Sequence, residues 1–427
     1  MSTRSPARAR ASPSSPRRPR VTTLIDADVL AGLRADAAAQ LPEIAALRHA
    51  LHRTPELGLD LPATQRLVLD ALAPLGLEVT TGDRLSSVVA VLRGDRPGPA
   101  VLLRGDMDAL PVTEDSGEPF SSENPGVMHA CGHDLHVAGL VGAARLLAAR
   151  RAAIAGSVVL MFQPGEEGDH GARLMIEEGV LDAAGSRVVA AYGLHVLSSM
   201  LPAGLVTSRP GTMLAAADTV HVTVTGRGGH GSMPHLAADP VPVAAEIVLA
   251  LQAMVTRQFD IFDPVVVTVG RIEAGTTDNV IPSTARLEAT VRTFSEAVHA
   301  VVPERLARLC EGIAAAHGMT VDVDYQRGYP VTSNTPAEVD RAAALARGLL
   351  GDEAYHPAPQ PLSGAEDFSY LLQEVPGVYL GLGATPVGED PQTAAYNHSA
   401  QARFADEALA VGPAVLAALA LDRLAEG

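Results

Sequence analysis

One stretch of nine residues combines a thiol, three imidazoles and a carboxylate: Met128-His129-Ala130-Cys131-Gly132-His133-Asp134-Leu135-His136. His129, Cys131 and His133 are two residues apart, so an extended or turn-like backbone would project them to one side. A loop with a Cys and a His at this spacing can supply two ligands to one metal ion. A free Cys is also commonly a small buried apolar residue. This stretch alone leaves both interpretations open.

Three apolar runs of strand length are each followed by polar side chains that can bind a metal or move a proton. In chain order these are Asp106 and Asp108, then Glu166 and Glu167, then His195. The carboxyl ends of neighbouring strands meet at one edge of an open α/β sheet, so we expect these side chains to gather there. One such strand would be a coincidence, whereas three favour a functional site.

The chemistry of these side chains points to metal ions. Thiolate, imidazole and carboxylate ligands together suit Zn²⁺, and imidazole and carboxylate sites also take Mn²⁺, Co²⁺ or Ni²⁺. With His398 included, the candidates exceed what one tetrahedral ion needs, and two ions with a shared ligand and a water between them would use them all. Adjacent glutamates on an extended segment point to opposite sides, so one can bind metal while the other acts as a base. This set predicts metal-assisted hydrolysis of an amide or related acyl bond.

The composition limits the class of protein. The chain has 427 residues, of which 47% are apolar, and a formal net charge of −17. This length predicts two domains, or one large domain with an insertion. The acidic balance argues against a nucleic-acid partner, because phosphate binding favours a basic surface. Two cysteines, Cys131 and Cys310, are too few for a disulfide framework and predict a reducing compartment.

The N-terminal segment consists almost entirely of Ser, Pro, Arg and Ala. It lacks the apolar segment of a signal peptide, so we expect a disordered tail over residues 1–20. Elsewhere Arg, Gly or Pro interrupts the apolar runs before they could cross a bilayer. We therefore expect a cytoplasmic protein without a membrane partner.

The elements that must position the polar residues alternate between strands and helices. Helical periodicity over 25–51 and 64–75 precedes two short strands, and the three apolar runs follow. This order predicts an α/β fold, an open mixed sheet with helices on both faces. We assign its first part to residues 21–211 and its second part to residues 327–427.

Residues 212–326 have a different pattern. A half-exposed strand at 218–225, a Gly-rich loop, a helix, two strands, a second helix and a last strand at 320–325 follow in order. This βαββαβ order is ferredoxin-like, and the segment is long enough for an independent domain. We therefore predict a domain inserted into the α/β fold.

Several of these segments, in this order, resemble the aminoacylase and hippurate hydrolase family of dinuclear metallohydrolases. The Cys-Gly-His version resembles the subgroup that removes acyl groups from amino acids, including the indole-acetyl-amino-acid hydrolases. The resemblance runs from about His49 to the C-terminus. The segments that carry it are Arg104-Gly105-Asp106-Met107-Asp108-Ala109-Leu110-Pro111, His129-Ala130-Cys131-Gly132-His133-Asp134, Gln163-Pro164-Gly165-Glu166-Glu167-Gly168 and Gly193-Leu194-His195.

The resemblance implies two divalent metal ions per subunit (Zn or Mn, with Co or Ni possible) and a small N-acyl amino acid as substrate. It implies that metal-bound water attacks the amide with Glu166 as general base. The inserted domain would be a lid through which a homodimer forms. His230 would stabilise the tetrahedral oxyanion and contact the substrate, and Asn279 would lie near the substrate carboxylate. By itself, a His in a Gly-rich loop is equally well a solvent-exposed residue. The implied metal ligands are Cys131, His133, Glu167, His195 and His398.

The sequence departs from the family pattern at Thr54, where the usual motif has a His before Pro-Glu-Leu-Gly. Asp106 and Asp108 are not ligands in this subgroup, and we expect them to orient a ligand or the base. Asp108 is counted with the catalytic residues for that reason. We expect supporting or structural roles for His129 and His136.

Two alternatives remain open. Cys131 precedes a helix whose N-terminus would lower the pKa of the thiol, and with His195 and a carboxylate it could form a cysteine hydrolase. The other alternative is a relative that binds a metal or ligand without turnover, although such a protein would not need Glu166 beside a ligand glutamate. The acyl group is left open: N-acetyl, benzoyl and longer conjugates are candidates, as is N-acetyl-diaminopimelate.

Overall fold

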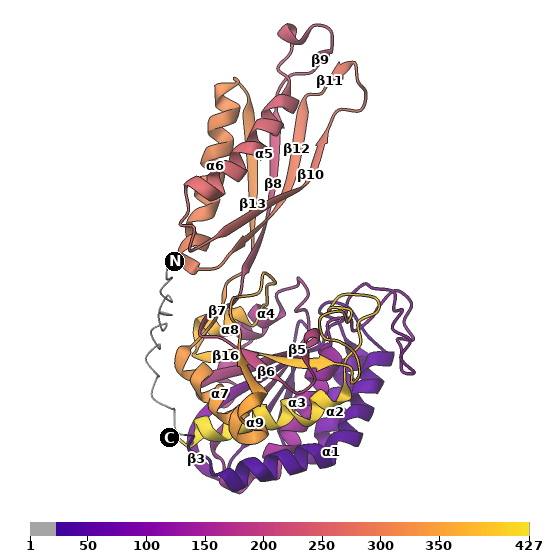
Figure 1. The fold of residues 1–427 in the computed structure, drawn as a ribbon, viewed down its shortest axis with the longest axis vertical. Helices are drawn as coiled ribbons and strands as arrows, with labels where there is room; N and C mark the ends of the chain where they lie inside the picture. Colours follow the sequence, from indigo (N-terminus) through magenta and orange to yellow (C-terminus); the bar gives the residue numbers. More distant parts are fainter. Residues whose placement is uncertain (1–22, 427) are drawn as a thin grey trace, which may run out of the picture.

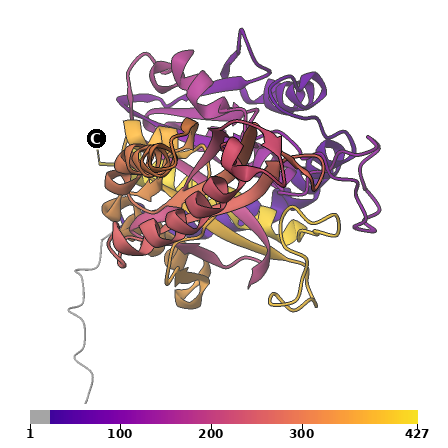
Figure 2. The same cartoon turned by 90° about the horizontal axis from the view of Figure 1, so that it is seen from above.

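The computed structural model describes residues 23–426, so the tail expected over residues 1–20 lies outside the described residues. The chain forms a larger domain with an inserted domain standing above it (Figure 1). It passes between the domains after β7 (Gly211–Leu214) and again before β14 (Thr332–Asn334), and these two strands pair antiparallel at the junction. Viewed from above, the inserted domain covers only part of the larger one (Figure 2).

The larger domain is built on a mixed sheet of eight strands in the order β1-β2-β4-β3-β5-β16-β6-β15. The central strands β4, β3, β5 and β16 run parallel, whereas β2 is antiparallel to β4 and β6 is antiparallel to β16. This arrangement confirms the predicted fold class. The strands are β1 (Glu78–Thr81), β2 (Val88–Arg93), β3 (Arg96–Asp106), β4 (Ala155–Gln163), β5 (Val188–Pro202), β6 (Val206–Ser208), β15 (Tyr355–Pro357) and β16 (Gly377–Thr385).

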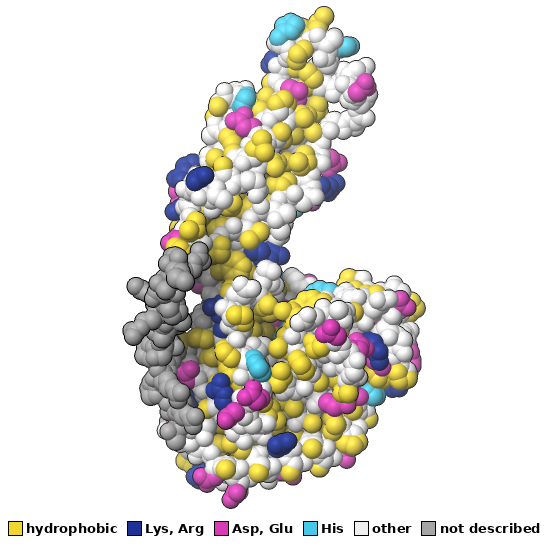
Figure 3. Space-filling view, viewed as in Figure 1, with side chains coloured by type: hydrophobic (Ala, Val, Ile, Leu, Met, Phe, Trp, Pro, Cys, Tyr) yellow, Lys and Arg dark blue, Asp and Glu magenta, His cyan; other side chains and the backbone are white. Residues whose placement is uncertain are grey.

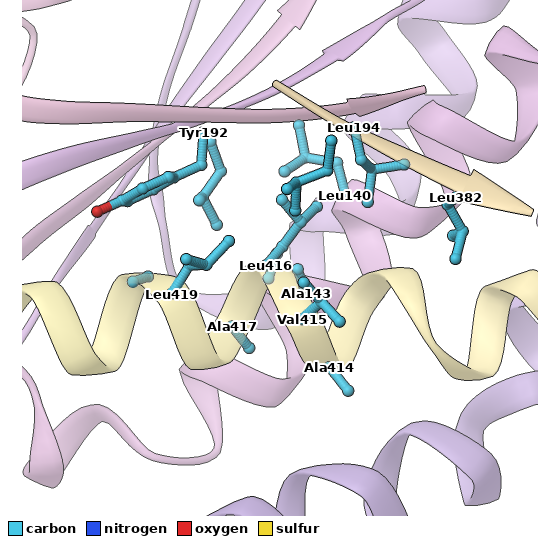
Figure 4. Packing of buried hydrophobic residues seen from close by; sticks show 14 of the residues in the cluster. Leu140, Ala143, Tyr192, Leu194, Leu382, Ala414, Val415, Leu416, Ala417 and Leu419 are labelled. Atoms are coloured by element: carbon cyan, nitrogen blue, oxygen red, sulfur yellow. The ribbon is translucent and has the colours of Figure 1, made fainter. Parts of the chain in front are cut away.

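Helices cover both faces of this sheet. Alternate side chains of a strand point to opposite faces, so a strand that is apolar throughout makes both faces apolar and both need cover. In β3, Val101 and Leu103 join the main apolar core, whereas Ala100 and Leu102 join a smaller core on the other face. Figure 4 shows the main core, where α9 and α3 pack against β5 and β16. The helices are α1 (Ala27–Arg53), α2 (Pro62–Leu72), α3 (His133–Ala148), α4 (Gly171–Glu177), α7 (Pro336–Leu350), α8 (Ser369–Glu374) and α9 (Gly412–Leu424).

The inserted domain has the predicted ferredoxin-like order. Its sheet runs β10-β12-β8-β13, with each neighbouring pair antiparallel. Buried Val220, Val222 and Val224 alternate along β8 with more exposed residues and join one core with α5 and α6. The elements are β8 (Ala216–Thr225), β9 (Gly229–His230), α5 (Pro240–Arg257), β10 (Val265–Ala274), β11 (Val280–Ile281), β12 (Thr284–Thr293), α6 (Glu296–Ala316) and β13 (Thr320–Tyr329).

One helix in the described part of the chain, α5, is long and apolar enough to cross a membrane by length and composition alone. One face of this helix is nevertheless buried in the core of the inserted domain through Val243, Ile247 and Leu251. The expectation that the protein has no membrane partner stays a prediction.

The end of β5 corrects one expectation. We expected the strand to finish at His195, but it continues to Pro202. The neighbouring strand β16 keeps pairing beyond this point, with Gly381 opposite His195 and Thr385 opposite Pro202. Because backbone hydrogen bonds to the partner strand sustain β5, the polar side chain of His195 does not end it. His195 therefore projects from the interior of β5.

Candidate active site

Cys131 lies at the centre of the site. Its Sγ atom is 3.3 Å from Nε2 of His195 and 3.2 Å from Nε2 of His398. The three side chains come from the loop before α3, from the interior of β5 and from the loop that follows β16. The parallel pairing of β5 with β16 brings these distant segments together.

Two further donors face the same space. Oε1 of Glu167 is 3.3 Å from Nε2 of His398 and 4.0 Å from Nε2 of His133. Within the described residues, Glu167 Oε1 and His133 Nε2 make no hydrogen bond although both atoms are buried. A buried polar atom without a partner is costly, so this pair indicates a site that a bound ion would satisfy.

Two backbone carbonyl groups fix the orientation and the tautomer of two imidazole rings. The oxygen of Asp108 lies 2.8 Å from Nδ1 of His133, and the oxygen of Val196 lies 2.8 Å from Nδ1 of His195. Because a carbonyl oxygen can only accept, each Nδ1 carries a proton, and in the neutral ring each Nε2 turns its lone pair toward the cluster. Metal ligation through Nε2 requires this tautomer.

The two loops that carry Cys131 and His398 depend on left-handed backbone. Gly132 has a φ of 84°, and a Cβ atom there would come within 2.4 Å of Val196 Cγ2, so only glycine fits. His398 has a φ of 73°, which is unusual for a residue with a side chain. Its backbone N–H donates to the carbonyl oxygen of Ala130 at 2.8 Å and holds the two loops together.

The electrostatics of the cluster favour a cation. Burial alone would raise the pKa of the Cys131 thiol, but the neighbouring His195 and His133 lower it to about 6. The neighbouring Cys131 thiol and Glu167 carboxylate raise the pKa of His398 to about 10. The thiolate and the carboxylate thus draw protons onto the imidazoles, and a divalent ion can take the place of those protons.

Glu166 lies beside the cluster and is also buried. Its carboxylate is within 4.8 Å of the carboxylates of Glu366 and Asp367. Burial, and then the charge of Glu366, raise the pKa of Glu166 well above its usual range. The buried Arg104 guanidinium donates to both Glu366 and Asp367 at 2.9 Å and keeps these two carboxylates paired. A carboxyl group with a raised pKa can accept a proton and return it near neutral pH.

Asp108 holds the turn that carries both glutamates. Its Oδ1 accepts from the N–H of Glu166 at 3.0 Å and its Oδ2 accepts from the N–H of Glu167 at 2.9 Å. Asp106 instead lies 2.5 Å from Nδ1 of His136, whose Nε2 accepts from the N–H of Val196 at 2.9 Å. Both ring nitrogens of His136 are therefore occupied within the protein, as a structural role requires.

His129 is fully buried, and within the described part of the chain neither of its ring nitrogens makes a hydrogen bond. Burial lowers the pKa of His129 to about 3, so the ring stays neutral. Its side chain is not among the candidate ligands.

His230 and Asn279 lie together but away from the cluster. β9, which carries His230, pairs with β11, and the carbonyl oxygen of Asn279 accepts from the N–H of Gly231 at 2.8 Å. Both segments form the end of the inserted domain that is farthest from the larger domain (Figure 1). Within one chain the structure does not bring these two residues to the cluster around Cys131.

The cysteine hydrolase alternative lacks one of its parts. His195 does contact the Cys131 thiol, but its Nδ1 faces the carbonyl oxygen of Val196. The dyad that we considered needs a carboxylate at that nitrogen to stabilise the imidazolium during transfer. The same contacts do suit a metal ligand, as described above.

Some residues of the site were missed in the sequence. Asn397 donates to the carbonyl oxygens of Cys131 at 3.1 Å and Val196 at 3.0 Å and so joins three segments. Its place next to His398 was the only available signal. Tyr329, at the end of β13, donates to the carbonyl oxygen of Glu166, and no local pattern marks it.

The donor set fits divalent metal ions, because thiolate, imidazole and carboxylate groups lie close together and include unpaired buried atoms. A two-domain α/β protein with such a cluster at its parallel strands has the architecture of metal-dependent hydrolases with a zinc-peptidase-like catalytic domain. The comparisons with known proteins identify the family within that class.

The family model of Peptidase family M20/M25/M40 matches residues 102–422. Thermostable carboxypeptidase 2 of Saccharolobus solfataricus is 38% identical over 379 residues, which cover 88% of this chain and 94% of the relative. N-acetylcysteine deacetylase of Bacillus subtilis is 36% identical over 80% of this chain and 88% of the relative. Hippurate hydrolase of Campylobacter jejuni is 34% identical over 90% of this chain and 97% of the relative.

A solved structure agrees with these matches. A dinuclear metal-binding peptidase of the M20 family from Bacillus subtilis superposes with a TM-score of 0.78 at 32% identity, covering 91% of this chain and 99% of that one. The chain therefore belongs to Peptidase family M20/M25/M40. The family resemblance inferred from the sequence is confirmed, and the chain is a hydrolase of the amide-cleaving peptidase and amidohydrolase class.

Proposed function

We propose that this protein is a metal-dependent amidohydrolase that cleaves the amide bond of N-acyl amino acids. The observation that carries the proposal is the cluster around Cys131 with buried Glu166 at its side. The relatives named for the hydrolysis of N-acetylcysteine and hippurate support the substrate class.

Two groups of donors support two metal ions. Cys131, His133 and His195 form one group, and Cys131, Glu167 and His398 form the other, with the donor atoms of each group within 4.8 Å of one another. The thiolate is common to both groups, which favours Cys131 as the shared ligand. Zn²⁺ or Mn²⁺ suits these donors, and Co²⁺ or Ni²⁺ would also fit. When bound, such ions supply acidification of a water molecule and polarisation of the acyl carbonyl group.

The role of Glu166 follows from its position. Its carboxylate would take the proton of the attacking water and deliver it to the nitrogen of the leaving amino acid. The water oxygen then remains on the acyl carbon, so the products are a carboxylic acid and a free amino acid. Burial raises the pKa of Glu166 and so stabilises its protonated form, which supports the second half of this transfer, in which the residue acts as an acid.

The carboxypeptidase relative favours a second candidate substrate. A peptide and an N-acyl amino acid share the same reacting group, an amide whose nitrogen belongs to an amino acid with a free carboxylate. Parallel assays of N-acetyl and N-benzoyl amino acids and of the corresponding dipeptides, with metal-reconstituted protein, distinguish the two. Faster cleavage of the dipeptides would reject the N-acyl amino acid as the preferred substrate.

We also propose a cytoplasmic homodimer that forms through the inserted domain. β10 is an edge strand of its sheet, and the neighbouring helix α5 exposes 72% of Leu249 and 43% of Val241. Figure 3 shows apolar side chains gathered on this domain. An unpaired edge beside exposed apolar residues suits association with a second copy. In a dimer, His230 and Asn279 of one subunit could serve the site of the other. A monomer in sedimentation at micromolar concentration would contradict this proposal.

The catalytic proposal is tested by Glu166→Gln with Cys131→Ser as the comparison. Glu166→Gln keeps the size of the side chain but cannot accept the proton, so we expect both metals to stay bound and kcat to fall by about 100-fold or more. Cys131→Ser removes the shared ligand, so metal content should fall together with activity. Metal is measured by elemental analysis and turnover with N-acetyl amino acids. Unchanged turnover of Glu166→Gln would refute the role of this residue.

A further inference from the structure

The last strand of the inserted domain ends in direct contact with the turn of residues 166–168, which carries Glu166 and Glu167. The hydroxyl group of Tyr329, the final residue of β13, donates to the carbonyl oxygen of Glu166 at 2.5 Å and accepts from the N–H of Gly168 at 2.8 Å. Only 9% of Tyr329 is exposed. One hydroxyl group therefore bridges both ends of the turn whose middle residue is Glu167.

The inserted domain fixes this end of β13 firmly. Pairing with β8 is irregular between Gln326 and Tyr329, so the strand bends there. Asp218 of β8 accepts from the N–H of Gly328 at 2.9 Å and from the hydroxyl of Tyr325 at 2.6 Å. His299 of α6 lies 3.0 Å from the same carboxylate. Tyr329 thus ends a segment that is bonded to the rest of the inserted domain.

Among the described residues, the other hydrogen bonds to this turn come from the larger domain. The carboxylate of Asp108 accepts from the N–H groups of Glu166 and Glu167, and it belongs to the segment that follows β3. Asp108 and Tyr329 therefore form hydrogen bonds to the turn from two different domains. The position of Glu167 and the direction of the Glu166 side chain depend on both sets of hydrogen bonds.

We propose that Tyr329 is a positioning residue, which ties the turn carrying Glu166 and Glu167 to the inserted domain. Its hydroxyl group aligns the ligand and the base for metal binding and for proton transfer without touching the substrate. A rotation of the inserted domain at β13 would pull on this turn. The inference rests on the proposed function for the roles of Glu166 and Glu167.

Tyr329→Phe tests the proposal, because it removes the bridging hydroxyl and keeps the ring. We expect the apoprotein to bind Zn²⁺ or Mn²⁺ about tenfold more weakly, since losing a partner that orients a ligand commonly costs this much. We expect kcat for an N-acetyl amino acid to fall about tenfold with KM changed less than about twofold, because ground-state contacts with the substrate are intact. Hydrogen exchange of the peptide covering residues 164–171 should become faster.

Tyr370→Phe is the matched control. The Tyr370 hydroxyl donates to the carbonyl oxygen of Gly328 at 3.1 Å and lies 3.0 Å from Nδ1 of His170, so it binds the same junction through atoms outside residues 166–168. This variant should leave metal affinity and kcat within about twofold of the parent. Equal effects of Tyr329→Phe and Tyr370→Phe, or none from either, would overturn the proposal.

Calorimetric metal binding and hydrogen exchange need no substrate, so they separate this inference from the proposed function. If the parent cleaves no N-acyl amino acid but Tyr329→Phe alone weakens metal binding and loosens residues 164–171, the proposed function fails and the positioning role stands. If Tyr329→Phe lowers the unfolding temperature more than the control, exchange in the rest of β13 shows whether the strand itself has opened. Opening of the whole strand with an unchanged exchange rate at 164–171 would count against the proposal.

Discussion

Asp108→Asn changes the contact on which the two glutamates most directly depend. In the parent protein each carboxylate oxygen of Asp108 accepts one backbone N–H, from Glu166 at 3.0 Å and from Glu167 at 2.9 Å. Asparagine keeps the shape but replaces one acceptor oxygen by an NH₂ group. One of the two N–H groups then faces a donor, and the turn must shift or leave that N–H unpaired.

The size of the effect follows from these contacts. A hydrogen bond to a charged acceptor contributes about 1.5–3 kcal/mol, and an unsatisfied buried N–H costs about 1–3 kcal/mol. Because Asp108 is only 1% exposed, water cannot take the place of the lost acceptor. We expect the native conformation of the turn to be destabilised by a free energy of about 2–4 kcal/mol. Expressed fully in the transition state, this loss lowers kcat by roughly 30-fold to 1,000-fold.

The assay is steady-state hydrolysis of an N-acetyl amino acid by metal-saturated protein, with metal content measured on the same sample. Glu338→Gln is the control, since Glu338 is also a buried carboxylate but contacts Tyr192 and Arg341 away from the site. It should lower stability and leave kcat nearly unchanged. A folded, fully metallated Asp108→Asn protein with kcat within twofold of the parent would refute the reasoning.

Two other predictions concern the inserted domain. Hydrogen bonds to Asp218 and Glu296 raise the pKa of His299 from 6.5 to about 9, so its contribution to stability is full below pH 6.5 and is lost as the pH rises toward 9. Urea unfolding should show a loss of up to about 3 kcal/mol across this range, and His299→Gln should flatten the dependence. If His230 serves the partner's site, mixing inactive Glu166→Gln and His230→Ala proteins under subunit exchange should restore activity. No recovery from a mixture with verified exchange would show that His230 does not act between subunits.

Local sequence determined much of the fold and part of the site. The spacing of Cys131 and His133 predicted that both side chains would face one site. In the structure the left-handed Gly132 lies between them and His133 is the first residue of α3, so the prediction holds although the backbone is not extended there. Apolar runs followed by carboxylates likewise predicted β3 and β4, since parallel strands present their carboxyl ends at one edge. The ferredoxin-like order of the inserted domain followed from its periodicity.

Tertiary structure decided what depends on contacts between distant segments. Pairing with β16 extended β5 past His195, although nothing in the sequence of β5 required it. The carbonyl groups that set the tautomers of His133 and His195, and the hydroxyl of Tyr329 on the catalytic turn, come from backbone and side chains without a sequence signature. Residue type and spacing thus predicted the candidate metal ligands. Only the folded chain determined which groups orient them, because a hydrogen bond between remote segments depends on packing that no local pattern encodes.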